Sequence, residues 1–165
     1  MPLGNPTHKD LLGSLWSYCL RTALIASLPT LIGVCVALIA TYIAGMSRGG
    51  PMVKLPMPDL WDLFGNIVFA PVTETATLVV GLLLLGKTTM SARSSSLICG
   101  VGFGILHGFL QGWIKFPVAA WGFYYFATAF QVWRQTSIAK AVVAALAPHV
   151  VVNATVMAVL AAYSI

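Results

Sequence analysis

The amino-acid sequence predicts an all-α fold, a polytopic bundle of about five transmembrane helices, in one integral membrane domain spanning residues 1–165. Hydrophobic residues make up 59% of the chain and charged residues only 8%, whereas soluble domains carry about 25% charged residues. The mean hydropathy is +0.90. The apolar runs are also long enough to cross a bilayer, which takes roughly 20 helical residues.

Five apolar runs predict the spans. In chain order they are Thr22–Met46, Leu63–Gly86, Leu97–Trp113, Phe116–Trp133 and Ile138–Ile165. The third and fourth runs are short and meet in a tight turn around Ile114 and Lys115. The segment 45–62, between the first two spans, is rich in Gly and Pro and therefore predicts a surface loop or interfacial segment.

Charged and aromatic residues predict the orientation. With the N-terminus inside, the inner loops hold six basic residues, namely Lys9, Arg21, Lys87, Arg93, Arg134 and Lys140. The outer loops hold three, namely Arg48, Lys54 and Lys115. Because inner loops carry the excess of Lys and Arg, this distribution predicts an N-in, C-out topology. Tryptophans near the span ends are expected to be interfacial anchors, namely Trp16, Trp61, Trp113, Trp121 and Trp133.

Other classes of protein fit the sequence poorly. The basic residues are scattered near span ends and not clustered with aromatic residues, so we expect no nucleic-acid partner. Cys19, Cys35 and Cys99 have no CxxC or CxxH spacing, which predicts neither a disulfide framework nor a cysteine zinc site. The polar N-terminal segment and the long first apolar run predict no cleavable signal peptide.

Four strongly polar residues lie within the predicted spans and are the candidate site residues. Glu74, the only glutamate, lies in the second span, His107 in the third, and His149 and Asn153 in the fifth. An ionisable group in hydrocarbon costs at least about 2.5–3.5 kcal/mol, so it faces protein or water and is a functional candidate. Each residue alone could instead form an ordinary hydrogen bond between helices.

The spacing of these residues predicts that they meet. His149 and Asn153 are four residues apart and share one helix face. At about 1.5 Å per residue, Glu74 and His149 each lie roughly 16 Å into their spans, near mid-membrane. His107 lies closer to the outer end, so a helix tilt or a funnel is needed to join it to them.

Prolines predict irregular backbone at the same places. Pro71 precedes Glu74 by three residues, and Pro148 directly precedes His149. A proline inside a helix frees a carbonyl one turn back, and such backbone is tolerated at membrane depth where it is buried in protein or lines a cavity. The hydroxyls of Thr73, Thr75 and Thr77 are expected to satisfy some of the freed groups.

These residue types favour hydrolysis of an amide bond inside the membrane. A carboxylate and an imidazole can together deprotonate a water, and a second imidazole with an amide can donate to an oxyanion. No Ser or Cys is placed as a nucleophile, and no cofactor is expected. A zinc ion held by Glu74, His107 and His149 is an alternative.

The sequence resembles the CAAX-protease and bacteriocin-processing family of glutamic intramembrane proteases, also called the Abi family. That family has an AP-hydrophobic-x-EExxxR element followed by FxxxH and HxxxN. The matching segments are APVTETATLV (residues 70–79), FGILH (103–107) and HVVVN (149–153). The resemblance implies that Glu74 and His107 activate a water. It also implies that His149 and Asn153 form the oxyanion site, within a catalytic-like core of about residues 63–160.

Two positions differ from the family pattern, because Thr75 replaces its second acid and Val79 its arginine. They favour the alternative of a non-catalytic bacteriocin-immunity or scaffold protein, and a third alternative is a small transporter or proton relay. The protease interpretation implies a membrane protein or peptide as substrate and a multi-pass location in a bacterial inner membrane. Because only one span precedes the motif, a homodimer or a partner membrane protein is expected to complete the cavity wall.

Overall fold

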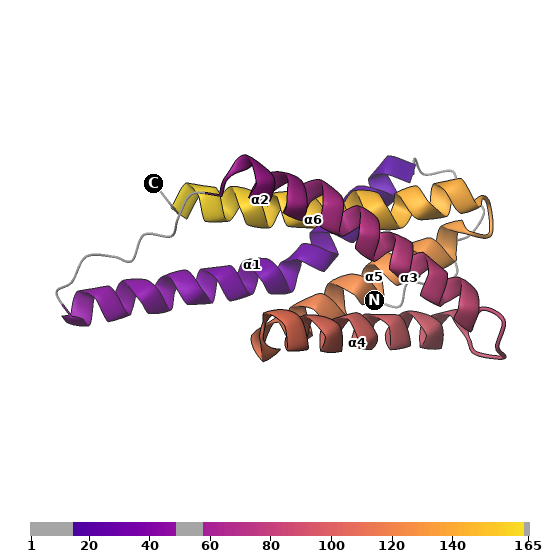
Figure 1. Cartoon of the computed structure of the whole chain (residues 1–165), viewed down its shortest axis with the longest axis horizontal. Coiled ribbons are helices and arrows are strands. Elements are labelled where there is room, and N and C mark those ends of the chain that lie inside the picture. Colours follow the sequence, from indigo (N-terminus) through magenta and orange to yellow (C-terminus); the bar gives the residue numbers. More distant parts are fainter. Residues whose placement is uncertain (1–14, 49–57, 164–165) are drawn as a thin grey trace.

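The computed structural model describes residues 15–48 and 58–163, which contain helices and connections but no strand (Figure 1). The helices are α1 (Leu15–Arg48), α2 (Leu60–Phe64), the π-helical turn η1 (Gly65–Phe69), α3 (Ala70–Leu85), α4 (Ala92–Gln111), the 3₁₀ turn η2 (Trp113–Lys115), α5 (Phe116–Trp133) and α6 (Ile138–Tyr163). Among these described residues, four segments are long and apolar enough to cross a bilayer: Leu15–Gly33, Leu60–Leu85, Ala92–Gln111 and Ile138–Ala162. The all-α membrane bundle is therefore confirmed.

The fourth predicted span differs from the other four. Helix α5 begins and ends where the sequence predicts, but it is not among the apolar segments, since it carries Tyr124, Tyr125 and Gln131. Many of its side chains are buried, Phe126 and Phe130 among them. A helix surrounded by protein need not be apolar on every face, so the crossing of the bilayer by α5 stays a prediction, as does the N-in orientation.

The segment between the first two spans is only partly the predicted loop. Helix α1 continues to Arg48, residues 49–57 lie outside the described residues, and α2 begins at Leu60. Asp59 caps α2, because its side chain accepts from the Asp62 N–H at 2.8 Å while the Asp62 carboxylate accepts from the Asp59 N–H at 3.2 Å. Helices α2, η1 and α3 then run on without a break.

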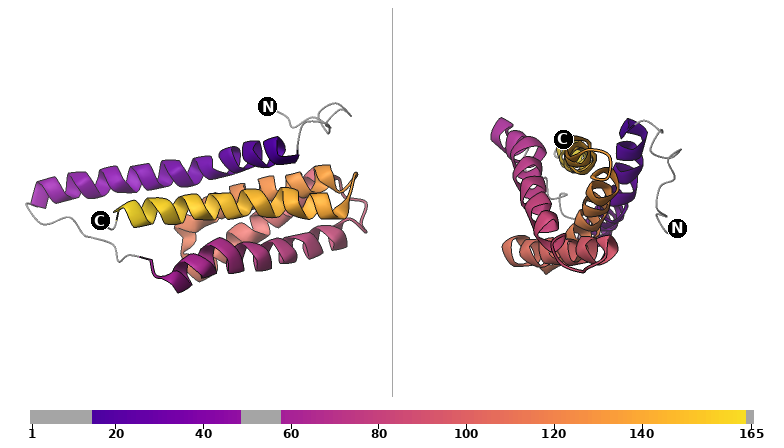
Figure 2. Two further views of the ribbon diagram at one scale, coloured as in Figure 1. Left: turned by 90° about the horizontal axis from the view of Figure 1, so that it is seen from above. Right: turned by 90° about the vertical axis from the view of Figure 1, so that its right-hand side faces the viewer.

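The helices pack around α5 and α6. Helix α6 lies between α1 and α3, and α5 packs against α4, α6 and α1 (Figure 2). The buried core contains Leu78 and Leu82 from α3, Phe123, Phe126 and Phe130 from α5, and Ala141, Ala144 and Ala145 from α6. The alanines on α6 bring its backbone close to its neighbours, as is common between membrane helices.

Glycines hold α4 close against α5. A Cβ added at Gly100 would lie 2.8 Å from the Ala120 carbonyl oxygen, and one added at Gly104 would lie 2.7 Å from the Ala120 Cβ. The two backbones therefore approach as closely as small residues allow. The close packing of α4 on α5 also positions His107, which lies about one turn beyond Gly104 on α4.

A proline frees a carbonyl in α1, and a side chain from α5 binds it. Pro29 has no N–H to donate to Ile25, four residues earlier. The Trp121 indole donates its Nε1–H to that Ile25 carbonyl at 2.9 Å. This bond ties α5 to α1.

A second freed carbonyl lies in η1. The Ala70 N–H donates to Gly65 in the wider π-helical pattern, and Pro71, which would follow it, has no N–H. The Asn66 carbonyl therefore has no helical donor, and Asn153 on α6 supplies one through Nδ2 at 2.8 Å. The prediction that a nearby threonine hydroxyl would bond the freed carbonyl was wrong for Asn66. The Thr73 hydroxyl bonds the Phe69 and Ala70 carbonyls instead.

One tryptophan is not the interfacial anchor that the sequence predicts, since Trp133 is buried against Tyr18, with ring centroids 5.8 Å apart. Trp16, Trp61, Trp113 and Trp121 are exposed, which agrees with an interfacial position. Trp121 in addition bonds the Ile25 carbonyl.

Candidate active site

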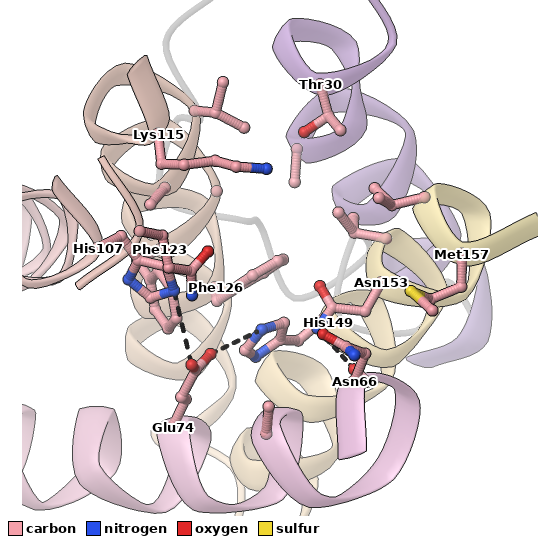
Figure 3. Close-up of a pocket in the computed structure, with 18 residues that line it drawn as sticks. Thr30, Asn66, Glu74, His107, Lys115, Phe123, Phe126, His149, Asn153 and Met157 are labelled. Carbon is pink, nitrogen blue, oxygen red and sulfur yellow. Dashed lines mark hydrogen bonds and ion pairs between the residues drawn. The ribbon is translucent and has the colours of Figure 1, made fainter. Parts of the chain in front are cut away.

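Glu74 lies between two imidazoles from different helices. Its Oε1 is 3.5 Å from His107 Nε2 on α4, and its Oε2 is 3.3 Å from His149 Nε2 on α6 (Figure 3). Both imidazoles face the same carboxylate. The structure thus brings together three of the four predicted site residues, and the tilt needed to bring His107 to Glu74 is present.

The His149 imidazole makes a contact at each of its two nitrogens. His149 Nδ1 is 3.2 Å from the Thr75 hydroxyl, which lies on the same helix as Glu74 and is buried. We assign the Thr75 O–H as donor to Nδ1, because Nε2–H can then donate to the Glu74 carboxylate.

Aromatic rings enclose His149. Its ring stacks on Phe126 with centroids 4.7 Å apart and meets the edge of Phe123 at 5.1 Å. The His149 side chain is only 4% exposed. Packing on two rings and hydrogen bonds at both nitrogens therefore fix the orientation of this imidazole.

The contact between His107 and the carboxylate requires a proton between them. His107 Nδ1 lies 2.9 Å from the Phe103 carbonyl, which can only accept, so Nδ1 carries a hydrogen. His107 Nε2 then faces Glu74 Oε1. Two lone pairs would repel each other there, so the contact is attractive only when one proton lies on Nε2 or on the carboxyl group.

The site lines a cavity of about 180 Å³ between the helices. Glu74, His107, His149 and Asn153 all contribute to its wall, and Glu74 is 26% exposed. Asn153 donates one of its amide hydrogens to the Asn66 carbonyl, and no hydrogen bond among the described residues joins it to Glu74 (Figure 3). Its amide nitrogen has a second hydrogen, which is available to a group bound in the cavity.

Sequence reasoning overlooked several residues at this site. Asn66 and Gln111 are polar residues within predicted spans and line the cavity. The rule that singled out Glu74 would have found both, had it been applied to every amide. Thr75 was predicted to bond a freed backbone carbonyl and was noted as a departure from the family pattern, but no sequence signal showed that it faces His149.

The zinc alternative gains no support from the geometry. Within residues 15–48 and 58–163, no group of three or more His, Cys, Asp and Glu side chains is arranged to hold a metal ion. Glu74 instead contacts His107 through Oε1 and His149 through Oε2.

No protein-family model, curated protein or solved structure matches this chain. The chemical interpretation of the site therefore depends on its geometry and on the three short motifs.

Proposed function

We propose that this protein is an intramembrane endopeptidase that hydrolyses a peptide bond of a membrane-associated protein or peptide. The observation that carries the proposal is the Glu74 carboxylate, in contact with two imidazoles at a cavity between apolar helices. A carboxylate in this position is costly to bury and is oriented from both sides. The resemblance to the glutamic intramembrane proteases supports the same assignment.

In the proposed reaction, Glu74 is the general base. A water oxygen bonds to the substrate carbonyl carbon while one water proton passes to the Glu74 carboxylate, which His107 orients through Nε2. The second N–H of Asn153 donates to the oxyanion. The C–N bond then breaks and its nitrogen takes the proton, so that one water and one amide give a carboxylic acid and an amine.

In this proposal, the role of His149 differs from the oxyanion role that the family resemblance implies. Its Nε2 contacts Glu74, so it orients the base in the resting site rather than facing an oxyanion. Thr75 supports it from the other nitrogen. The replacement of the family's second acid by threonine thus leaves His149 with a partner, which favours an active enzyme over a scaffold.

A proton relay is the second candidate function. The contact of one carboxylate with two imidazoles is the observation that favours it, because protons can pass between such groups. For either function we propose that the protein lies in a bacterial inner membrane. We also propose that a second copy of the chain or a partner membrane protein completes the wall of the cavity.

The test compares membrane-protein termini in cells that express the wild type or Glu74→Gln at equal levels. We expect new peptide ends only with the wild type. Lys140→Gln is the matched control, because Lys140 is exposed near the start of α6 and does not line the cavity, so it should give the wild-type ends. Identical termini for the wild type and a folded, inserted Glu74→Gln would refute the protease proposal.

A further inference from the structure

A lysine lines the wall of the same cavity. Lys115 ends the η2 turn between α4 and α5, and its ammonium group points into the cavity (Figure 3). Of the described residues that line the cavity, Lys115 alone is a lysine or arginine. Nothing in the proposed hydrolysis uses it.

Lys115 has no anionic partner in the part of the chain that the structure describes. The ion pairs among residues 15–48 and 58–163 are those of Glu74 with His107 and His149. An ammonium group has three donors and no acceptor. A cation without a partner beside a cavity is therefore suited to bind an anionic group that enters with a ligand.

The residues between His107 and Lys115 along the cavity wall suit a ligand that is an extended peptide. Helix α4 runs from His107 to Gln111, a rise of about 6 Å, before η2 brings Lys115 to the cavity. An extended peptide beside His107 would reach the height of Gln111 in about two residues. Gln111 lines the wall between them and offers an amide to a peptide backbone.

We propose that Lys115 is a specificity-determining residue that binds a carboxylate of the peptide substrate within the cavity that holds the scissile bond. This inference rests on the proposed function, since it assumes a peptide in the cavity. The carboxylate belongs either to an Asp or Glu side chain or to a free C-terminus, and both present the same acceptor to the lysine.

Binding, separate from hydrolysis, tests this inference. Full-length Glu74→Gln protein in phosphatidylcholine nanodiscs is incubated with N-octanoyl tetrapeptides randomised at every position. One pool has free C-termini and the other has C-terminal amides, and mass spectrometry identifies the retained members. We compare Glu74→Gln alone with the same protein carrying Lys115→Met, Lys115→Arg or Lys140→Met, and with empty nanodiscs.

With Lys115 present, we expect peptides that carry a carboxylate to be retained about tenfold over matched peptides without one. Lys115→Met should abolish the preference, while Lys115→Arg and Lys140→Met should keep it. Retention of amides that contain Asp or Glu identifies a side-chain carboxylate, and retention of free acids alone identifies the C-terminus.

The proposal is overturned by retention no greater than on empty nanodiscs, by equal retention of both kinds of peptide, or by a preference that survives Lys115→Met. A preference that depends on Lys115, combined with unchanged membrane-protein termini in cells, would keep the carboxylate site and reject the protease function.

Discussion

Thr75 Oγ1 lies 3.2 Å from His149 Nδ1, and both side chains are buried. The opposite nitrogen of the same ring contacts Glu74, the residue that precedes Thr75 in the chain. Two consecutive residues of α3 therefore hold one imidazole of α6 at its two nitrogens. This arrangement depends on the hydroxyl of a residue that would otherwise be taken for helix packing.

Thr75→Val should lower turnover and change the tautomer of His149. Valine has the shape of threonine but leaves Nδ1 buried without a donor, at a cost of about 1–3 kcal/mol. The ¹⁵N chemical shifts of the His149 ring report its tautomer, and cleavage of a mapped substrate reports turnover. Thr75→Ser should restore both.

Thr77→Val is the matched control for that experiment. Thr77 is exposed and its hydroxyl bonds only the Thr73 carbonyl of its own helix. It should leave the His149 spectrum unchanged. An unchanged spectrum and turnover in Thr75→Val would show that the hydroxyl does not position His149.

Trp121→Phe should destabilise the bundle by loosening α1 from α5. The substitution removes the indole donor and leaves the Ile25 carbonyl without it, at a cost of about 0.5–1.5 kcal/mol. Reversible unfolding in mixed micelles measures the change, and Trp16→Phe, at an exposed position on α1, should have little effect. Equal stability of the two variants would contradict a structural role for the indole bond.

The sequence predicted the bundle and most of the site because both follow from the cost of polar groups in lipid. Long apolar runs located the helices, and the same cost marked Glu74, His107 and His149 as residues that must face protein or water. The contact of these three residues agrees with that reasoning.

The cross-helix bonds could not be predicted in the same way. The bond from Asn153 to Asn66 requires a π-helical turn before Pro71, and the prolines alone do not specify one. The bond from Trp121 requires the crossing of α1 and α5 to bring an indole to one carbonyl. Such contacts depend on the crossing angles of the helices and on how each helix is turned about its own axis. The spacing of apolar residues in the sequence says little about either.

Gly100→Ala should destabilise the contact of α4 with α5. The added methyl would lie 2.8 Å from the Ala120 carbonyl oxygen, which is backbone and cannot move aside alone. We expect a loss of about 1–3 kcal/mol in the free energy of unfolding.

Gly102→Ala is the control, since nothing lies within 4 Å of its added Cβ. It should be neutral or stabilising, because alanine favours a helix more than glycine does. Equal losses in the two variants would contradict the close approach.

Glu74→Asp separates a protease from a proton relay. Aspartate keeps the charge but is shorter by one methylene, so it cannot keep both of the imidazole contacts that Glu74 makes. A base displaced by about 1 Å can lose 10²-fold in rate, whereas a relay tolerates a shorter carboxylate when protons still pass.

Two measurements on the same preparation test this prediction. One is cleavage of a mapped substrate, and the other is proton uptake by liposomes that contain a pH-sensitive dye. Loss of cleavage in Glu74→Asp, with no proton uptake by the wild type, would support the protease. Proton uptake by the wild type that persists in Glu74→Asp and disappears in Glu74→Gln would support the relay, because only the charge and not its position would then be required.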